Sequence, residues 1–176
     1  MSRYGVAVTT TESSQADFGA SLPRKQMAAG ALLFDAAGRI LLVQPTYKQV
    51  WDLPGGVVEA DESPHTAVCR ELKEELGLHR AWLDLLTVDW QSPQDGMLEG
   101  MRFVFDGGVV QPDEISAITL PADELRGWAF CTPEEAKGLV SPRLARRISA
   151  SLDARSAGRA AYLENGYPLD RPWHDE

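Results

Sequence analysis

The stretch GVVEADESPHTAVCRELKEELGL, from Gly56 to Leu78, decides the fold. Its second half predicts a helix over residues 64–76, because Ser63 is a good N-cap and Pro64 suits the first helical position. Gly77 can adopt the left-handed conformation that ends a helix. Apolar residues at helical spacing form the stripe that would pack on a core: Ala67, Val68, Leu72 and Leu76.

A second face of this helix collects acidic side chains. Glu71, Glu74 and Glu75 are spaced i, i+3 and i+4, so they share that face, and each pair of like charges costs about 0.2–0.5 kcal/mol. Arg70 can partner Glu71 or Glu62, but one guanidinium does not neutralise four carboxylates. A divalent cation would, and carboxylate oxygens favour Mg²⁺, with Mn²⁺ as a substitute, over zinc. The alternative is an ordinary solvated acidic helix face.

The whole stretch also follows a known pattern. It matches the Nudix box, Gx5Ex7REUxEExGU with U an apolar residue, at every specified position: Gly56, Glu62, Arg70, Glu71, Leu72, Glu74, Glu75, Gly77 and Leu78. The preceding WDLPGG, at residues 51–56, is similar to the usual approach to this box. The chain therefore resembles the Nudix hydrolase superfamily, and no catalytic position of the box departs from the pattern.

The resemblance implies an architecture and an activity. The expected fold class is α/β, an α/β/α sandwich in which a mixed β-sheet lies between helices and the box helix presents its acidic face to a cleft. The expected reaction is hydrolysis of a diphosphate bond in a nucleoside diphosphate linked to another moiety, with Mg²⁺ or, in its place, Mn²⁺. The expected partner is a nucleotide-type small molecule.

The resemblance also assigns catalytic roles within the box. Glu71, Glu74 and Glu75 resemble the metal-binding cluster, and the carbonyl of Gly55 is a further expected ligand. Either Glu71 or Glu75 would deprotonate the attacking water. The general base is therefore left open between these two side chains.

The remaining box residues have supporting roles by the same resemblance. Arg70 belongs to the candidate catalytic set, and with Glu62 it is expected to orient the carboxylates and to fix the loop. Gly55 and Gly56 let the backbone turn tightly and approach a ligand closely. Gly77 is expected to end the helix.

A carboxylate outside the box is a further candidate. Many Nudix enzymes draw an additional catalytic base or metal ligand from a loop near the last strand of the sheet. Glu124 is the candidate for this role and Glu114 is the reserve. No fixed motif supports either residue, so the alternative for both is a solvated carboxylate.

Three residues are candidates for substrate contacts. Trp51 could stack on a base, or serve as an aromatic residue of the core or of a cavity wall. Arg102 belongs to a predicted strand with alternating faces, so it either lines the cleft or faces water. Pro93 lies fifteen residues beyond Leu78, a spacing that resembles the family's ADP-ribose pyrophosphatases, and nucleoside triphosphates are comparably favoured as substrates.

Hydrophobic periodicity predicts the other elements. The segments QMAAGALLFD and RILLVQ predict a hairpin of two largely buried strands. Further strands are expected at residues 82–90, 101–110 and 125–130, and helices after the capping box of Thr132 and Glu135 and over residues 142–155. Three arginines on the polar side of the last helix are expected to be surface charges rather than phosphate ligands: Arg143, Arg146 and Arg147.

The length of 176 residues supports one domain with a real core. Residues 1–24 are expected to form a flexible arm, in which Tyr4–Val8 could pair as an edge strand, and residues 25–160 to form the Nudix domain. Residues 161–176 form a tail that is a hairpin closing a cleft, a hairpin joining two subunits of a homodimer, or a frayed end. The sequence leaves these alternatives open.

Composition limits the function classes. A net charge of −9 argues against a nonspecific nucleic-acid binder or a membrane-surface binder, because both need a basic patch. Bound cations would still allow a phosphate substrate. Cys69 and Cys131 are expected to be reduced structural thiols. A cytoplasmic location is expected, because the sequence shows neither a membrane-spanning apolar run nor a signal-peptide pattern.

Two other function classes are alternatives to hydrolysis. A nucleotide-sensing binding module on this fold would tolerate loss of the box glutamates, and here none is lost. An isoprenoid diphosphate isomerase on the same fold needs a protonating cysteine and a carboxylate. Cys69 and Cys131 give no clear support for that chemistry.

Overall fold

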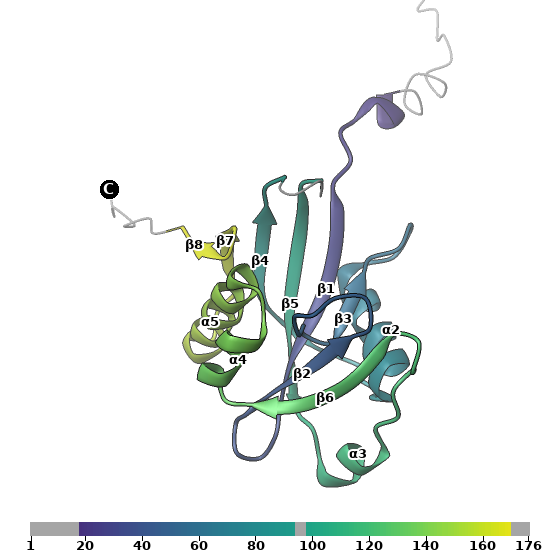
Figure 1. The fold of residues 1–176 in the computed structure, drawn as a ribbon. Helices are drawn as coiled ribbons and strands as arrows, with labels where there is room; N and C mark the ends of the chain where they lie inside the picture. The colour runs from purple at the N-terminus through teal and green to yellow at the C-terminus, as the bar shows by residue number, and fades with distance from the viewer. Residues whose placement is uncertain (1–17, 94–97, 170–176) are drawn as a thin grey trace, which may run out of the picture.

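The computed structural model describes residues 18–93 and 98–169. These contain the strands β1 (Gln26–Phe34), β2 (Ile40–Pro45), β3 (Gly55–Val57), β4 (Asp84–Gln91), β5 (Gly100–Val109), β6 (Leu125–Cys131), β7 (Ala161–Glu164) and β8 (Tyr167–Pro168). Within this part of the chain they form one sheet in the order β6-β2-β1-β5-β4-β7-β8, and β3 pairs with β1 outside this path (Figure 1). The sheet is mixed, because β1 runs parallel to β5 but antiparallel to β2 and β3.

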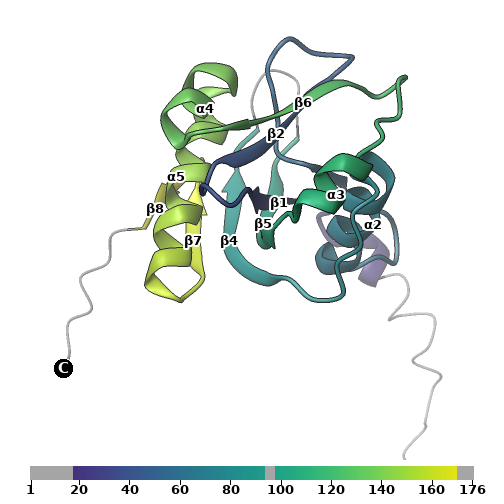
Figure 2. The same ribbon diagram turned by 90° about the horizontal axis from the view of Figure 1, so that it is seen from below.

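Helices cover both faces of this sheet. They are α2 (Pro64–Leu76), α3 (Pro112–Ala117), α4 (Pro133–Leu139) and α5 (Pro142–Ala157). Figure 2 shows α2 and α3 on one side of the sheet and α4 and α5 on the other. The expected α/β/α sandwich is therefore confirmed. In the described ranges, no helix is both long and apolar enough to cross a membrane.

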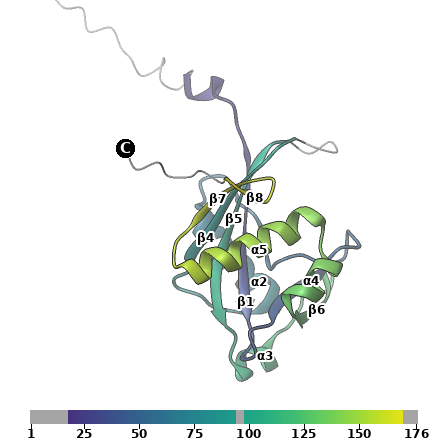
Figure 3. The same ribbon diagram turned by 90° about the vertical axis from the view of Figure 1, so that its left-hand side faces the viewer.

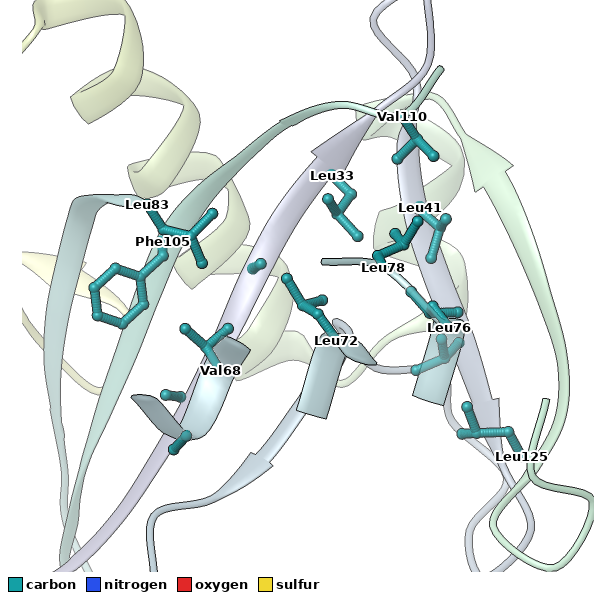
Figure 4. Close-up of a cluster of buried hydrophobic side chains, with 14 of the residues drawn as sticks. Leu33, Leu41, Val68, Leu72, Leu76, Leu78, Leu83, Phe105, Val110 and Leu125 are labelled. Carbon is teal, nitrogen blue, oxygen red and sulfur yellow. The ribbon is translucent and has the colours of Figure 1, made fainter. Parts of the chain in front are cut away.

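Each face of the sheet has its own hydrophobic core. The core beneath α2 contains the predicted stripe of that helix, packed on β1 and β2 (Figure 4): Val68, Leu72, Leu76, Leu33 and Leu41. The core beneath α4 and α5 contains side chains from both helices and from the opposite sheet face: Ala136, Leu144, Ile148, Leu32 and Leu42. Alternate residues of β1 and β2 therefore serve opposite cores, which explains why both strands are apolar along their length.

The helix predicted over residues 64–76 forms with those bounds. The Ser63 hydroxyl accepts a hydrogen bond from the Thr66 backbone N–H at 3.1 Å, and Pro64 occupies the first turn. At the other end, Gly77 has φ 71° and donates its N–H to the Lys73 carbonyl at 3.0 Å, and the Leu78 N–H donates to the Leu72 carbonyl at 3.0 Å. The predicted caps therefore fix both ends of α2.

The hairpin predicted from β1 and β2 forms only at its closed end. Phe34 is opposite Ile40. Farther along, β3 takes the place beside β1, with Ala29 opposite Gly56 and Gly30 opposite Gly55. This pairing brings the start of the box against the centre of the sheet.

The other predicted elements are present, with ends that shift by no more than two residues. Helix α3 was not predicted. Residues 161–168 form a hairpin, in which β7 pairs parallel with β4 and β8 pairs antiparallel with β7. Figure 3 shows this hairpin beside α5. The strand considered at Tyr4–Val8 lies outside the described residues, and the domain bounds and the homodimer remain predictions.

Candidate active site

Two glycines allow three backbone segments to meet at the start of the box. Gly55 has φ +138°, and a Cβ there would lie 2.2 Å from the Ala29 carbonyl oxygen. A Cβ on Gly56 would lie 2.3 Å from Oε1 of Glu71. A side chain at either position would therefore push β3 away from β1 or from α2.

Arg70 is the centre of an ion-pair network on α2. Its Nε and Nη2 donate to the two carboxylate oxygens of Glu62, each at 3.0 Å. Its Nη1 donates to Glu71 at 2.8 Å and to Glu74 at 3.1 Å, and Nη2 also reaches the Val57 carbonyl at 3.1 Å. One guanidinium therefore ties the loop before α2, the acidic face of α2 and strand β3 together.

Glu75 lies deeper than the rest of the acidic face. It is only 7 % exposed, and its Oε2 accepts a hydrogen bond from the Gly55 N–H at 2.8 Å. Burial raises the pKa of Glu75 to about 8, against the effect of that hydrogen bond, and repulsion from Glu71, Asp52 and Glu124 adds to the rise. The site thus contains a buried carboxylate whose charge is poorly compensated.

The pKa of Glu71 is also raised, by less than that of Glu75. Burial raises its pKa, the Arg70 guanidinium opposes this, and the charges of Glu74 and Glu124 add to the rise. Two adjacent carboxylates on α2 therefore resist ionisation together. The charge of Glu71 also contributes to the raised pKa of Glu75.

The two candidate carboxylates outside the box have different surroundings. Glu124 lies just before β6, where its backbone carbonyl accepts a hydrogen bond from the Thr46 N–H at 2.8 Å. Its charge acts on both Glu71 and Glu75, so it lies near the acidic face. Glu114 instead binds Arg80 at 2.6 Å and caps α3 through the Gln111 N–H at 2.8 Å. These contacts favour Glu124 over the reserve candidate.

The donor chemistry of this region suits a hard divalent cation. The candidate ligands are all oxygens, and a cation would compensate the buried charge of Glu75. In the conformation described for residues 18–93 and 98–169, no three His, Cys, Asp or Glu side chains are arranged to hold a metal ion. Arg70 bridges Glu71 and Glu74, while Gly55 binds Glu75. The residues fit a divalent cation by type, and these contacts already engage the carboxylates.

A cavity of about 690 Å³ adjoins the acidic region. Gly55 and Gly56 line it, and the backbone of these same residues contacts Glu75 and Glu71. The volume falls within the roughly 300–1,000 Å³ of typical small-molecule sites. Glu71, Glu74, Glu75 and Glu124 are not among the lining residues, so the cavity meets the acidic region only through Gly55 and Gly56.

The predicted substrate residues divide between the cavity and the surface. Trp51 is half-buried and lines the cavity, with its backbone N–H bonded to the Leu139 carbonyl at 3.0 Å. Arg102 also lines the cavity. Pro93 is exposed just after β4 and is not among the lining residues.

The cavity is strongly basic, which the sequence analysis missed. Five basic residues and one acidic residue, Asp52, line it; the basic residues are Lys48, Arg102, Arg143, Arg146 and Arg147. The expectation that the last three are surface charges was wrong for Arg147, which is buried, whereas Arg143 and Arg146 are partly exposed at the cavity. A signal was available, because arginines in the first two turns of a helix oppose its dipole.

Comparisons with known proteins agree with this architecture. A family model described as "NUDIX domain" matches residues 24–152. A MutT-like protein from Streptomyces ambofaciens is 29 % identical over 141 residues, covering 80 % of this chain and 85 % of the relative. An RNA pyrophosphohydrolase from Gluconacetobacter diazotrophicus is 41 % identical over 98 residues, covering 48 % of this chain, which spans 58 % of that relative.

A solved structure supports the fold. The MutT protein from Methanosarcina mazei superposes with a TM-score of 0.62 at 24 % identity, over 78 % of this chain and 99 % of that one. At this level of identity the likeness concerns the fold alone.

Proposed function

Because this chain belongs to the Nudix hydrolase superfamily, we propose that it hydrolyses a diphosphate bond in a nucleoside diphosphate linked to another moiety, using Mg²⁺ or, in its place, Mn²⁺. One observation carries the proposal. The buried, poorly compensated Glu75 and its neighbour Glu71 contact the two glycines that line a nucleotide-sized cavity. The chemical groups and the space for the substrate are therefore adjacent.

The acidic face of α2 would hold the cation through Glu71, Glu74 and Glu75, with the Gly55 carbonyl as a further ligand. A bound divalent cation supplies charge neutralisation of the diphosphate and lowers the pKa of coordinated water. Arg70 and Glu62 act as positioning residues, because their paired hydrogen bonds hold the start of α2 against the preceding loop.

Three carboxylates are candidates to accept the proton of the attacking water. Glu71 and Glu75 have raised pKa values, which suit a base that works near neutral pH. Glu124 reaches the same region from the opposite segment and is not engaged by Arg70. We assign the base to this group of three.

The cavity would hold the nucleoside moiety, with Trp51 as a stacking surface and Arg102 as a polar contact. Pro93 lies outside the cavity lining, so it adds nothing in favour of an ADP-ribose-like substrate. One relative is named RNA pyrophosphohydrolase, so a 5′-phosphorylated RNA end is added to the substrates to test. Nucleoside triphosphates and ADP-ribose are tested beside it.

The isomerase alternative lacks a suitably placed thiol in the described residues. Cys69 lies in α2 and Cys131 in β6, neither lines the cavity, and burial raises the pKa of both. Both thiols are free, which fits the proposed cytoplasmic location. A nucleotide-sensing module would bind the same nucleotides without cleaving them, so only a measurement of cleavage separates it from the proposed hydrolase.

A substrate panel tests the proposal. The protein is incubated with Mg²⁺ and ADP-ribose, nucleoside triphosphates, NADH, dinucleoside polyphosphates, a 5′-triphosphorylated dinucleotide or dimethylallyl diphosphate, and the products are separated and quantified by chromatography. We expect metal-dependent cleavage of at least one nucleotide and none of dimethylallyl diphosphate. Binding without cleavage anywhere in the panel would instead identify a sensing module.

A further inference from the structure

The cavity is lined by a cluster of arginines outside the acidic face. We define its basic wall as Arg102 from β5 together with Arg143, Arg146 and Arg147 from α5. The whole chain has a net charge of −9, so a local excess of arginines does not reflect the average surface. Because like charges repel, such a concentration suggests an anionic ligand.

Arg102 is the member of the basic wall that comes from the sheet. It is half-buried, and its Nη1 donates to two neutral carbonyls, Met101 at 3.1 Å and Gln26 at 3.4 Å. Among the residues with described positions, no carboxylate forms a salt bridge with it. Burial and the charges of Arg147 and Arg143 lower its pKa. A half-buried guanidinium in this state would be stabilised by an anion in the cavity.

Arg147 is held in a fixed orientation behind the cavity surface. Its Nε and Nη2 both lie 2.7 Å from Oδ2 of Asp89, which is fully buried. The other Asp89 oxygen accepts the Gly166 N–H at 2.9 Å. Asp89 therefore pairs directly with Arg147, while it acts on Arg102 only through its charge, without a salt bridge.

The β7–β8 hairpin positions the basic wall from outside. Arg146 donates to the Asn165 carbonyl at 2.9 Å, and its guanidinium lies 4.4 Å from the centre of the Tyr167 ring. The Asn165 side chain accepts hydrogen bonds from the Ser92 N–H at 3.1 Å and the Ser92 hydroxyl at 2.9 Å. These contacts order the arginines before a ligand arrives, which reduces the entropy lost on binding.

The basic wall and the acidic face belong to opposite layers of the sandwich. The wall comes from β5 and α5, whereas the acidic face of α2 reaches the cavity at Gly55 and Gly56. The diphosphate would lie at the acidic face. An anion at the basic wall would be a second group, on the nucleoside side of the substrate.

We propose that the basic wall binds a phosphate carried by the substrate's ribose, outside the diphosphate that is cleaved. This inference rests on the proposed function. Guanidinium groups suit this ligand because they donate paired hydrogen bonds to phosphate oxygens. Such a phosphate can be a terminal ester on the ribose or the phosphodiester that links a second nucleotide. Both sources present the same anionic oxygens to Arg102.

A binding experiment without metal tests this inference on ligands that contain no diphosphate. The probes are AMP, adenosine 3′,5′-bisphosphate and a 5′-phosphorylated adenylate dinucleotide, each titrated calorimetrically against the full chain. We expect at least one of the two ribose-phosphate probes to bind about 10-fold or more tighter than AMP, the effect of one charge-assisted contact. Preference for the bisphosphate alone indicates a terminal ester, and preference for both indicates tolerance of a phosphodiester.

Two variants sharpen the result. Arg102→Gln should remove most of this preference, and Arg159→Gln, an exposed arginine outside the cavity lining with the same charge change, should leave it intact. Equal affinity of wild type for all three probes, absence of binding, or an equal loss in both variants would overturn the inference. Thermal unfolding checks that each variant is folded, and the wild-type comparison stands without the variants.

The outcomes separate this inference from the proposed function. A ribose-phosphate preference in a protein that cleaves nothing in the substrate panel would contradict only the proposed hydrolysis. Cleavage in the panel without this preference would contradict only the phosphate assignment to the basic wall.

Discussion

The acidic face of α2 and the basic wall of the cavity handle the same physical problem differently. Both gather like charges that repel. On α2 the charges come from one continuous segment, and a single guanidinium, Arg70, holds three carboxylates. In the basic wall the charges come from α5 and β5, and one buried carboxylate, Asp89, forms a salt bridge with Arg147 and acts on Arg102 through its charge. A charge cluster within one continuous segment can therefore be predicted from the sequence. A cluster that the fold assembles from separate segments becomes visible only in the structure.

The largest expected effect concerns the carboxylates of the acidic face. Glu74→Gln and Glu75→Gln should each lower turnover by about 100-fold or more, because stabilisation of developing charge is lost. Steady-state kinetics with Mg²⁺ on the substrate identified by the panel measure this. Glu59→Gln, an exposed position in the loop before α2, is the matched control and should retain activity. Full activity of either box variant would remove the proposed cation site.

The second effect concerns the arginine that organises the acidic face. Arg70→Ala should lower the free energy of unfolding by about 2 kcal/mol, or Tm by about 4–8 °C, because three carboxylates lose their shared donor. Arg159→Ala, at an exposed site, should change it by no more than about 0.5 kcal/mol. Calorimetric unfolding compares the two. Equal Tm values would mean that the network contributes nothing to stability.

A third effect follows from the buried carboxylate. The pKa of Glu75 rises from an ordinary 4.5 to about 8 in the folded protein, so the folded state binds more protons than the unfolded state between these values. Stability without metal should therefore fall as pH rises through this window. Glu75→Gln should flatten the dependence of Tm on pH and raise Tm near pH 8. A Tm that rises across the window equally in both proteins would contradict the assignment.

The smallest effect concerns the hairpin that supports the basic wall. Asn165→Ala should raise KM about threefold with little change in kcat, because Ser92 and the turn lose a hydrogen-bond acceptor and the arginines become less ordered. Asn165→Asp retains an acceptor and tolerates the positive φ of 54°, so it should restore KM. An equal KM in wild type and Asn165→Ala would separate the hairpin from substrate binding.

Local chemistry explains what the sequence could predict. The ends of α2 depend on Ser63 and Gly77, which act on neighbouring backbone groups, so they were predicted correctly. The two cores follow from periodic apolar residues. The box glutamates were predicted as a cluster for the same reason, since spacing along one helix determines which face they share.

Long-range pairing explains what the sequence left out. The basic wall depends on β5 and α5 meeting at one cavity, and its ordering depends on contacts between Asn165 and Ser92, far apart in the chain. The position of β3 beside β1 likewise depends on the sheet. Helix α3 is short and buries none of its residues, so it leaves no periodic apolar signal.

The position of the hairpin along the chain has a consequence for synthesis. Every partner of the Arg70 network lies between Val57 and Glu74, so that network can form soon after α2 emerges from the ribosome. The hydrogen bonds that hold Arg146 and Asp89 in place form only after Asn165 and Gly166 have been synthesised. A nascent chain would therefore acquire its acidic machinery well before it acquires an ordered place for the nucleoside.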